Sequence, residues 1–211
     1  MSKLDLFEKL PLEKQETILN AGLTEFSTKP YAEANTDNIT SACGISKGLL
    51  FYYFGSKKNF YLYCLSHSLN QLTAFAPEST GTDFYDILFS SMDAKVQLCL
   101  TYPLQTKLIN MASRECAKDI MTQKNALILE YTLKVKKHSS ELLTTALSTL
   151  QLKDPNNPYV TDGLSLYISS IINRYLLIYQ EKPEAFFNQA EAIKEELHCY
   201  IDLMLNGIMK E

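Results

Sequence analysis

The sequence predicts an all-α protein. Glycine and proline are scarce, with seven of each in 211 residues, and they separate long stretches that lack them. Those stretches repeat apolar residues at helical spacing and show no sustained alternation of apolar and polar residues, which is the pattern of a half-buried strand. With 46% hydrophobic residues the chain can bury a sizeable core. We expect two helical domains, over residues 1–77 and 78–211.

The first expected helix covers about residues 12–28 and begins near Pro11, a residue tolerated in a first helical turn. Its apolar stripe consists of Ile18, Leu19, Gly22, Leu23 and Phe26. A second, short helix follows. Thr36 is interpreted as its N-cap, with Asp37 near the positive end of the helix dipole, and Gly44 as its C-terminal residue.

The stretch GISKGLLFYYFGSKKNF, which begins at Gly44, predicts a third helix two residues after the second. Ser46 is expected to cap it and Gly55 to end it, and Ser56 is expected to cap a fourth helix that runs to about Phe75. Two short helices joined by a tight glycine-containing turn are typical of a helix-turn-helix, although an ordinary helical corner has the same pattern. In a helix-turn-helix the second helix enters the major groove of DNA.

Helical geometry divides the third helix into two faces. Ile45, Leu50 and Phe54 can point into a three-helix core. The outward residues are Lys47, Gly48, Phe51 and Tyr52. Exposed aromatic rings beside a lysine are costly in water unless they meet a partner, and base edges, thymine methyls and phosphates supply one. The pattern therefore favours a DNA-reading helix.

The charge distribution agrees with this interpretation. The formal net charge is −4, which by itself argues against a nucleic-acid binder. Residues 38–77, however, contain three lysines and no carboxylate, so a small basic face is expected on an acidic protein. No apolar run approaches the ~20 residues of a membrane span. The N-terminus is charged and has no signal-peptide core, so we expect a cytoplasmic protein without a membrane partner.

Residues Ile39–Leu62, ITSACGISKGLLFYYFGSKKNFYL, resemble the DNA-binding region of the TetR/AcrR family of bacterial transcriptional regulators. The resemblance covers about residues 12–65. It implies groove contacts by Lys47, Gly48 and Tyr52. The other DNA-binding residues that it implies are the backbone clamps Thr36, Tyr53 and Lys57 together with Ser46, Leu49 and Phe51. The sequence departs from the family at Phe51, where many members have tyrosine, and at Leu49, where a small or polar residue is commoner. No arginine precedes Arg114.

The C-terminal region predicts helices at about residues 83–101, 104–117, 122–150, 159–180 and 184–208. The segment 159–179 is apolar nearly all round and is expected to be buried on every side. The last helix repeats apolar residues at steps of three and four. We expect these two helices to form an intermolecular four-helix bundle in a homodimer, with an intramolecular core as the alternative. The expected interface residues are Ile168, Ile172, Tyr175, Ile193, Leu197, Tyr200 and Met204.

Polar residues embedded among apolar ones indicate a ligand-binding function for residues 78–211. The candidates are Tyr102, Arg114, Tyr131, His138, Tyr167 and Arg174. Arg114 is interpreted as a buried residue that anchors an acidic or polar ligand; a salt bridge with Glu115, Glu130 or Asp119 is the alternative. Tyrosines suit a pocket with apolar walls and hydroxyl groups, and equally a core with a wet edge. The identity of the effector is not encoded in any motif.

Enzymatic and metal-dependent functions receive no support from the sequence. No nucleophile–base pair or phosphate loop is present, so no catalytic residue is assigned and no cofactor is expected. Five scattered cysteines without C-x-x-C spacing are typical of reduced thiols, and the three histidines do not pair with them at metal-ligand spacing. The predicted function is a ligand-responsive repressor of a near-palindromic operator. A helical protein-interaction scaffold and an all-α enzyme are the alternatives.

Overall fold

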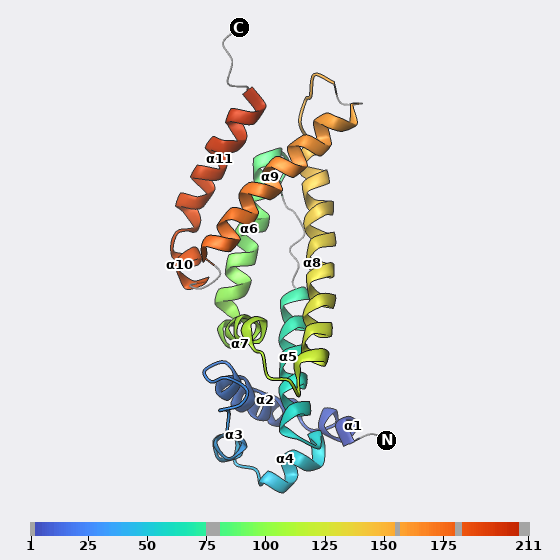
Figure 1. Cartoon of the computed structure of the whole chain (residues 1–211), viewed down its shortest axis with the longest axis vertical. Coiled ribbons are helices and arrows are strands. Elements are labelled where there is room, and N and C mark those ends of the chain that lie inside the picture. The colour runs from blue at the N-terminus through green and yellow to red at the C-terminus, as the bar shows by residue number, and fades with distance from the viewer. Residues whose placement is uncertain (1–2, 75–80, 155–156, 180–182, 207–211) are drawn as a thin grey trace. The chain divides into compact units, whose positions relative to one another are not determined.

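The computed structural model of the chain describes residues 3–74, 81–154, 157–179 and 183–206. Every regular element within these ranges is an α-helix (Figure 1), which confirms the predicted all-α fold. The helices in chain order are α1 (Lys3–Glu8), α2 (Leu12–Phe26), α3 (Thr36–Cys43), α4 (Lys47–Phe54), α5 (Lys57–Ala74), α6 (Phe84–Thr101), α7 (Pro103–Arg114), α8 (Met121–Ser148), α9 (Pro158–Tyr179), α10 (Pro183–Asn188) and α11 (Ala190–Asn206).

The chain folds into two compact units. The first contains α1–α5, and also the segment Leu98–Lys136 with α7 and the first half of α8. The second contains most of α6, the rest of α8 and α9–α11. Helix α7 therefore packs with the N-terminal helices, chiefly α5 and α2, although the sequence assigned it to the second domain. The predicted boundary at residue 77, like the predicted end of the fourth helix near Phe75, lies outside the described residues.

The core of the first unit contains a helix that the sequence did not predict. Helix α1 packs against α4 (Figure 1) and inserts Phe7, which is fully buried. The Phe7 ring centroid lies 5.8 Å from that of Tyr53, 4.8 Å from Phe54 and 5.6 Å from Tyr63. Six residues are too few to show a helical period, so only the burial of Phe7 reveals the role of α1.

The three predicted N-terminal helices are present as α2, α3 and α4. Ile18, Leu23 and Phe26 of α2 are almost completely buried, as the apolar stripe predicts. Gly22 allows α2 to approach α5 closely, because a Cβ atom there would lie 2.6 Å from the Phe60 ring and 2.9 Å from the Cys64 sulfur. This contact holds α2 and α5 together, and α3 and α4 pack against these two helices.

The second unit has its core between α6, α8, α9 and α11. Its most buried side chains include Ile168 and Ile201, and a neighbouring cluster contains Tyr175, Ile193 and Leu197. The predicted last helix, 184–208, is divided into α10 and α11 at Gln189. Within one chain the segment 159–179 is not buried on every side, since Leu166 is 70% exposed and Leu177 66%, and its burial by a partner chain stays a prediction. Helices α10 and α11 pack on α9 and leave these side chains exposed.

Within the described residues no helix is long and apolar enough to cross a membrane. All five cysteines carry free thiols; Cys64 and Cys99 are buried, whereas Cys116 and Cys199 are exposed.

Candidate nucleic-acid interface

The turn between α3 and α4 has the predicted helix-turn-helix geometry. Gly44 adopts φ 66° and ψ 28°, a left-handed conformation that ends α3, and its N–H donates to the Thr40 carbonyl. Ser46 then caps α4, because its hydroxyl oxygen accepts a hydrogen bond from the Leu49 N–H at 3.1 Å. Both of these sequence predictions are confirmed.

Helix α4 has one buried and one exposed face. Leu50 is fully buried and Phe54 is 5% exposed, as predicted. Lys47 and Gly48 are exposed, and Tyr52 is 49% exposed. A Cβ atom on Gly48 would meet only the Ser46 hydroxyl, at 3.8 Å, so packing within the chain does not require glycine at this position. Another surface can therefore approach the backbone of α4 closely at Gly48.

The other predicted DNA-contacting residues of α4 are half-buried: Leu49, Phe51 and Tyr53. Tyr53 contributes its ring to the aromatic cluster around Phe7 and Phe54. Its predicted contact with the DNA backbone is not tested by this packing and stays a prediction.

The N-cap of α3 is Asn35 and not Thr36. The Asn35 side-chain oxygen accepts from the Asp37 N–H at 2.8 Å, and Thr36 lies in the first turn with only 6% of its surface exposed. Asparagine and threonine are both common N-caps, and the sequence interpretation chose Thr36. Thr36 is mostly buried, which leaves little of it available for the predicted contact with a phosphate.

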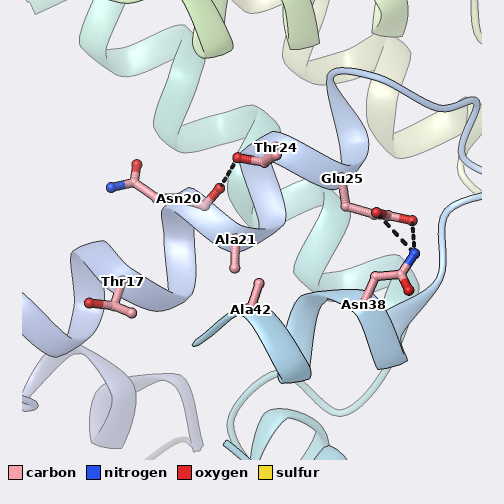
Figure 2. Close-up of a pocket in the computed structure, with 7 residues that line it drawn as sticks. All are labelled: Thr17, Asn20, Ala21, Thr24, Glu25, Asn38 and Ala42. Carbon is pink, nitrogen blue, oxygen red and sulfur yellow. Dashed lines mark hydrogen bonds between the residues drawn. The ribbon is translucent and has the colours of Figure 1, made fainter. Parts of the chain in front are cut away.

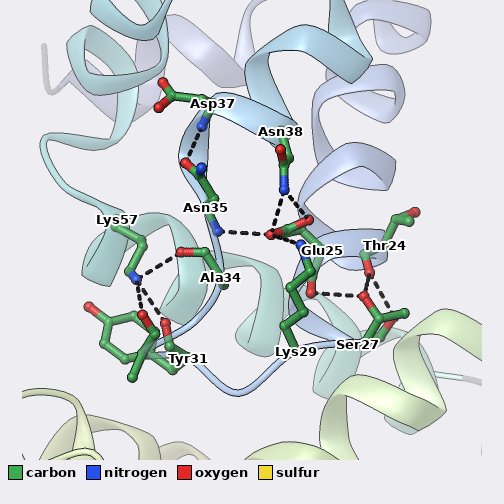
Figure 3. Close-up of polar contacts among 12 residues, drawn as sticks. Thr24, Glu25, Ser27, Lys29, Tyr31, Ala34, Asn35, Asp37, Asn38 and Lys57 are labelled. Atoms are coloured by element: carbon green, nitrogen blue, oxygen red, sulfur yellow. Dashed lines mark hydrogen bonds and ion pairs between the residues drawn. The ribbon is translucent and has the colours of Figure 1, made fainter.

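Lys57 binds within the protein. Its ammonium donates to the carbonyl oxygens of Tyr31 at 2.8 Å and Ala34 at 2.9 Å, and it lies 4.6 Å from the centre of the Tyr31 ring (Figure 3). The residue predicted to clamp DNA thus closes the turn between α2 and α3. Charge-assisted hydrogen bonds to two carbonyls fix the start of α5 relative to that turn.

Tyr31 connects this turn to the segment between α7 and α8. Its N–H donates to Glu115 Oε2 at 2.8 Å, and its hydroxyl donates to Asp119 Oδ2 at 3.0 Å. Burial, followed by the hydrogen bond to Asp119, raises the pKa of Tyr31 to about 12. Lys124 of α8 is 3% exposed and closes the same segment by donating to the Glu115 carbonyl at 2.7 Å. No local motif in the sequence indicated these contacts.

Glu25 ties α2 to the start of α3. Its carboxylate accepts from the Asn35 N–H at 2.8 Å, from Lys29 at 2.9 Å and from the Asn38 amide at 3.2 Å (Figure 3). Burial raises the pKa of this carboxyl, but the hydrogen bonds from Asn35, Lys29 and Asn38 together outweigh it and the net pKa is lowered. The carboxylate is therefore ionised at neutral pH.

An open groove lies between α2 and α3, with a volume of about 550 Å³ (Figure 2). Glu25 and Asn38, which bind each other, form one part of its lining. The remaining lining residues are Thr17, Asn20, Ala21, Thr24 and Ala42. None of the six predicted ligand-binding residues lines this groove.

The basic face near α4 includes an acidic residue. Asp37 lies just outside the acid-free stretch, and its Oδ1 atom is 2.9 Å from the Lys47 ammonium. Lys3 of α1 adds a cation on the other side, 5.9 Å from the centre of the Tyr52 ring. The surface around α4 therefore combines the Tyr52 ring, the exposed backbone at Gly48, Lys47 paired with Asp37, and Lys3 of α1.

The predicted ligand-binding residues are divided between the two units. Tyr102, Arg114 and Tyr131 belong to the first unit. His138, Tyr167 and Arg174 belong to the second. The interpretation of Arg114 as a buried residue is wrong, because it is exposed at the last turn of α7.

Tyr167 and His138, both in the second unit, differ in whether their polar side-chain atoms have hydrogen-bond partners. The Tyr167 hydroxyl donates to the Tyr200 carbonyl at 3.0 Å. His138 Nε2 is buried and has no hydrogen-bond partner among the described residues. The described residues contain no group of three or more side chains that could hold a metal ion.

The predicted dimer-interface residues lie mostly inside one chain. Ile168, Tyr175, Ile193 and Leu197 are at most 6% exposed and fill the core of the second unit. The other members of the predicted set are Ile172 and Tyr200, which are half-buried, and Met204, which is 44% exposed. Met204 is therefore the member of the predicted set that lies among the exposed apolar side chains of α9 and α11, with Leu166, Leu177 and Leu203.

With this geometry established, the chain can be compared with known proteins. Residues 18–64, which span α3, α4 and parts of α2 and α5, match the profile described as bacterial regulatory proteins, tetR family. The chain is 23% identical over 202 residues to YerO of Bacillus subtilis (strain 168), described as an uncharacterised HTH-type transcriptional regulator. The match covers 94% of this chain but only 65% of that relative.

Solved structures share the fold. The MbdR regulator from Azoarcus sp. CIB has a TM-score of 0.56 at 17% identity, over 93% of this chain and 100% of that chain. A TetR family transcriptional regulator from Chloroflexus aurantiacus J-10-FL has a TM-score of 0.52 at 20% identity, over 98% of both chains. The profile match confirms the resemblance found in the sequence and identifies the helix-turn-helix as a TetR-type DNA-binding domain. Proteins of this family are transcription factors and not enzymes.

The contacts of Lys57 predict a structural role for this residue. Lys57→Met keeps the length of the side chain but leaves the Tyr31 and Ala34 carbonyls without their donor, which should lower the free energy of unfolding by about 1–3 kcal/mol. Lys58→Met is the matched control, because it removes the same charge without these hydrogen bonds and should change stability by about 0.5 kcal/mol or less. Urea unfolding followed by circular dichroism measures both variants. Equal stability of the two variants would contradict this role.

Proposed function

We propose that the chain is a TetR-type regulator that acts as a ligand-responsive, cytoplasmic repressor, because residues 18–64 match the tetR family profile. In this proposal it binds a near-palindromic DNA operator as a homodimer and leaves the operator when a small molecule binds. The exposed face of α4 carries the proposal: Tyr52 and Lys47 are exposed beside bare backbone at Gly48. A DNA major groove supplies apolar methyl groups, base edges and phosphates that match this surface.

Selection of DNA from a pool of random duplexes tests the DNA-binding part. A two-fold dimer with one α4 per half-site should select a near-palindrome whose half-sites are about 34–36 Å apart, one turn of the double helix. Tyr52→Ala should weaken binding of the selected operator by about 1–3 kcal/mol, the range lost with one base contact. The dependence on salt should stay unchanged, because a tyrosine ring releases no counterion.

Tyr159→Ala is the matched control for this experiment. Tyr159 is 84% exposed on α9 and lies in the second unit, so its loss should leave operator affinity unchanged. If no sequence is enriched and rising salt does not weaken binding, α4 does not read DNA. Its aromatic residues would then form a protein-binding surface, as the alternative interpretation of the sequence has it.

The proposed effector site includes His138. A buried polar atom without a hydrogen-bond partner is costly, so the bare Nε2 atom of this residue favours a ligand with a hydroxyl or amide group opposite it. Tyr167 and Arg174, which belong to the same unit as His138, remain part of the proposal. Effector binding can release DNA only if the effector prefers the conformation that does not bind DNA.

His138→Phe tests this contact without placing a polar group in the same space. Compounds that release the wild-type protein from the selected operator are identified first, by fluorescence anisotropy of the labelled duplex. The variant should bind the operator as the wild type does but require about tenfold or more of the same compound for release, the cost of one lost hydrogen bond in a buried site. An unchanged response would remove His138 from the site.

The proposed dimer interface is the exposed apolar face of α9 and α11, which pack against each other. Leu166 and Leu177 are eleven residues apart and share one face of α9, and Leu203 of α11 is 52% exposed. Exposed apolar surface of this kind on two adjacent helices is typical of an interface between proteins. The four-helix bundle predicted from the sequence thus uses the outer face of the two helices.

Leu203→Glu tests the interface. Leu203 is exposed in the single chain, so the variant should fold normally, but a charge placed in a desolvated bundle should weaken the dimer by about 3 kcal/mol or more, at least about a hundredfold in Kd. Leu129→Glu, at a site on α8 that is 59% exposed, is the matched control and should remain dimeric. Sedimentation velocity distinguishes the two. A dimeric Leu203→Glu variant would place the interface elsewhere, and a monomeric wild type would exclude the dimer.

A further inference from the structure

The two helices of the helix-turn-helix are joined at their surface by an ion pair. Asp37 lies in the first turn of α3, and its carboxylate is 2.9 Å from the ammonium of Lys47, the first residue of α4. Both side chains remain accessible, with 61% of Asp37 and 49% of Lys47 exposed. An acid therefore lies beside Lys47, the single lysine of α4.

Local stability does not explain this pair. Exposed ion pairs contribute little to folding, because water screens them and two long side chains lose conformational freedom. The cap of α3 is supplied by the Asn35 side chain, which binds the backbone N–H of Asp37 and not its carboxylate. The Asp37 carboxylate lies near the positive end of the α3 dipole, which accounts for an acid in this turn but not for its pairing with Lys47.

We infer that Asp37 is a specificity-determining residue, which neutralises Lys47 and so suppresses binding to DNA of arbitrary sequence. This inference rests on the proposed DNA-binding function. Non-specific binding is supplied almost entirely by cations that neutralise phosphates and release counterions. A lysine already paired with a carboxylate adds no such contact unless the pair is broken.

The free-energy cost of separating Asp37 from Lys47 weakens mainly the binding of DNA that lacks the operator sequence. If Lys47 turns to a phosphate, Asp37 is left unpaired beside a polyanion; if the pair stays intact, the phosphate has no partner. Only a site whose other contacts hold α4 in register can offset that cost. Asp37 therefore lowers affinity for every sequence, and lowers it most where aromatic and backbone contacts do not fit.

The test compares the wild type with Asp37→Asn, Lys47→Gln and the double variant. Asparagine has nearly the shape of aspartate and suits the first turn of a helix, and thermal unfolding verifies that each variant is folded. The probes are the selected operator and a random-sequence duplex of equal length, each titrated at several salt concentrations. Asp86→Asn is the matched control, because Asp86 is likewise an exposed first-turn aspartate, on α6 in the second unit.

Asp37→Asn should bind the random duplex about three- to tenfold more tightly at 0.1 M salt and steepen the salt dependence by about 0.9, the value of one added phosphate contact. The ratio of operator affinity to random-duplex affinity should fall. In the Lys47→Gln background the same substitution should leave the salt slope unchanged, since no ammonium remains to be released. Asp86→Asn should behave as the wild type.

Two results would overturn the inference. If Asp37→Asn and Asp86→Asn give the same slope and the same affinity ratio as the wild type, Asp37 does not influence the choice of DNA. If Asp37→Asn weakens binding to both duplexes alike, the residue serves the structure of α3. Failure of the wild type to bind either duplex would instead be a failure of the proposed function itself.

Discussion

The hydrogen bonds around Tyr31 are the constraint on which the DNA-binding unit depends. Lys57, at the start of α5, donates to the Tyr31 carbonyl, while the Tyr31 backbone N–H and hydroxyl donate to Glu115 and Asp119. The turn between α2 and α3 is thereby fixed from two directions. Since α3 begins at this turn and α4 follows α3 after a short turn, the position of α4 is linked to a tyrosine that is only 7% exposed.

The same contacts make α7 part of the DNA-binding unit. Glu115 and Asp119 follow the last turn of α7, and Lys124 holds the Glu115 carbonyl from α8. A displacement of α7 must therefore either move the α2–α3 turn or break two hydrogen bonds to carboxylates, which are the stronger kind. An effector that binds at α7 or α8 can therefore change the position of α4 only if it binds more tightly to the conformation in which the α2–α3 turn has moved.

The sequence was sufficient for features that depend on local chemistry. Gly44, Ser46 and the buried pair Leu50 and Phe54 are determined by backbone conformation and helical period, and all four were predicted correctly. Contacts between distant segments were missed, because nothing near Tyr31 in the sequence indicates Glu115. The sequence did not separate the core face of α9 from its exposed face for a related reason: an apolar helix is apolar both where it fills a core and where it meets a partner chain. The exposed fraction of each side chain in the folded chain distinguishes a core position from an interface position.

In the proposed function, this acidic protein binds DNA with few cations and has to obtain affinity by other means. Lys57 is engaged by backbone carbonyls and Lys47 by Asp37, so counterion release contributes less than the number of lysines implies. In the proposed function, Tyr52 and the backbone at Gly48 would provide contacts that depend on shape and that salt does not weaken. The proposed two-fold dimer would add the second half-site as an intramolecular event, which multiplies affinity without further charge. Weak electrostatics and a symmetric pair of aromatic helices would then favour sequence preference over general attraction to DNA.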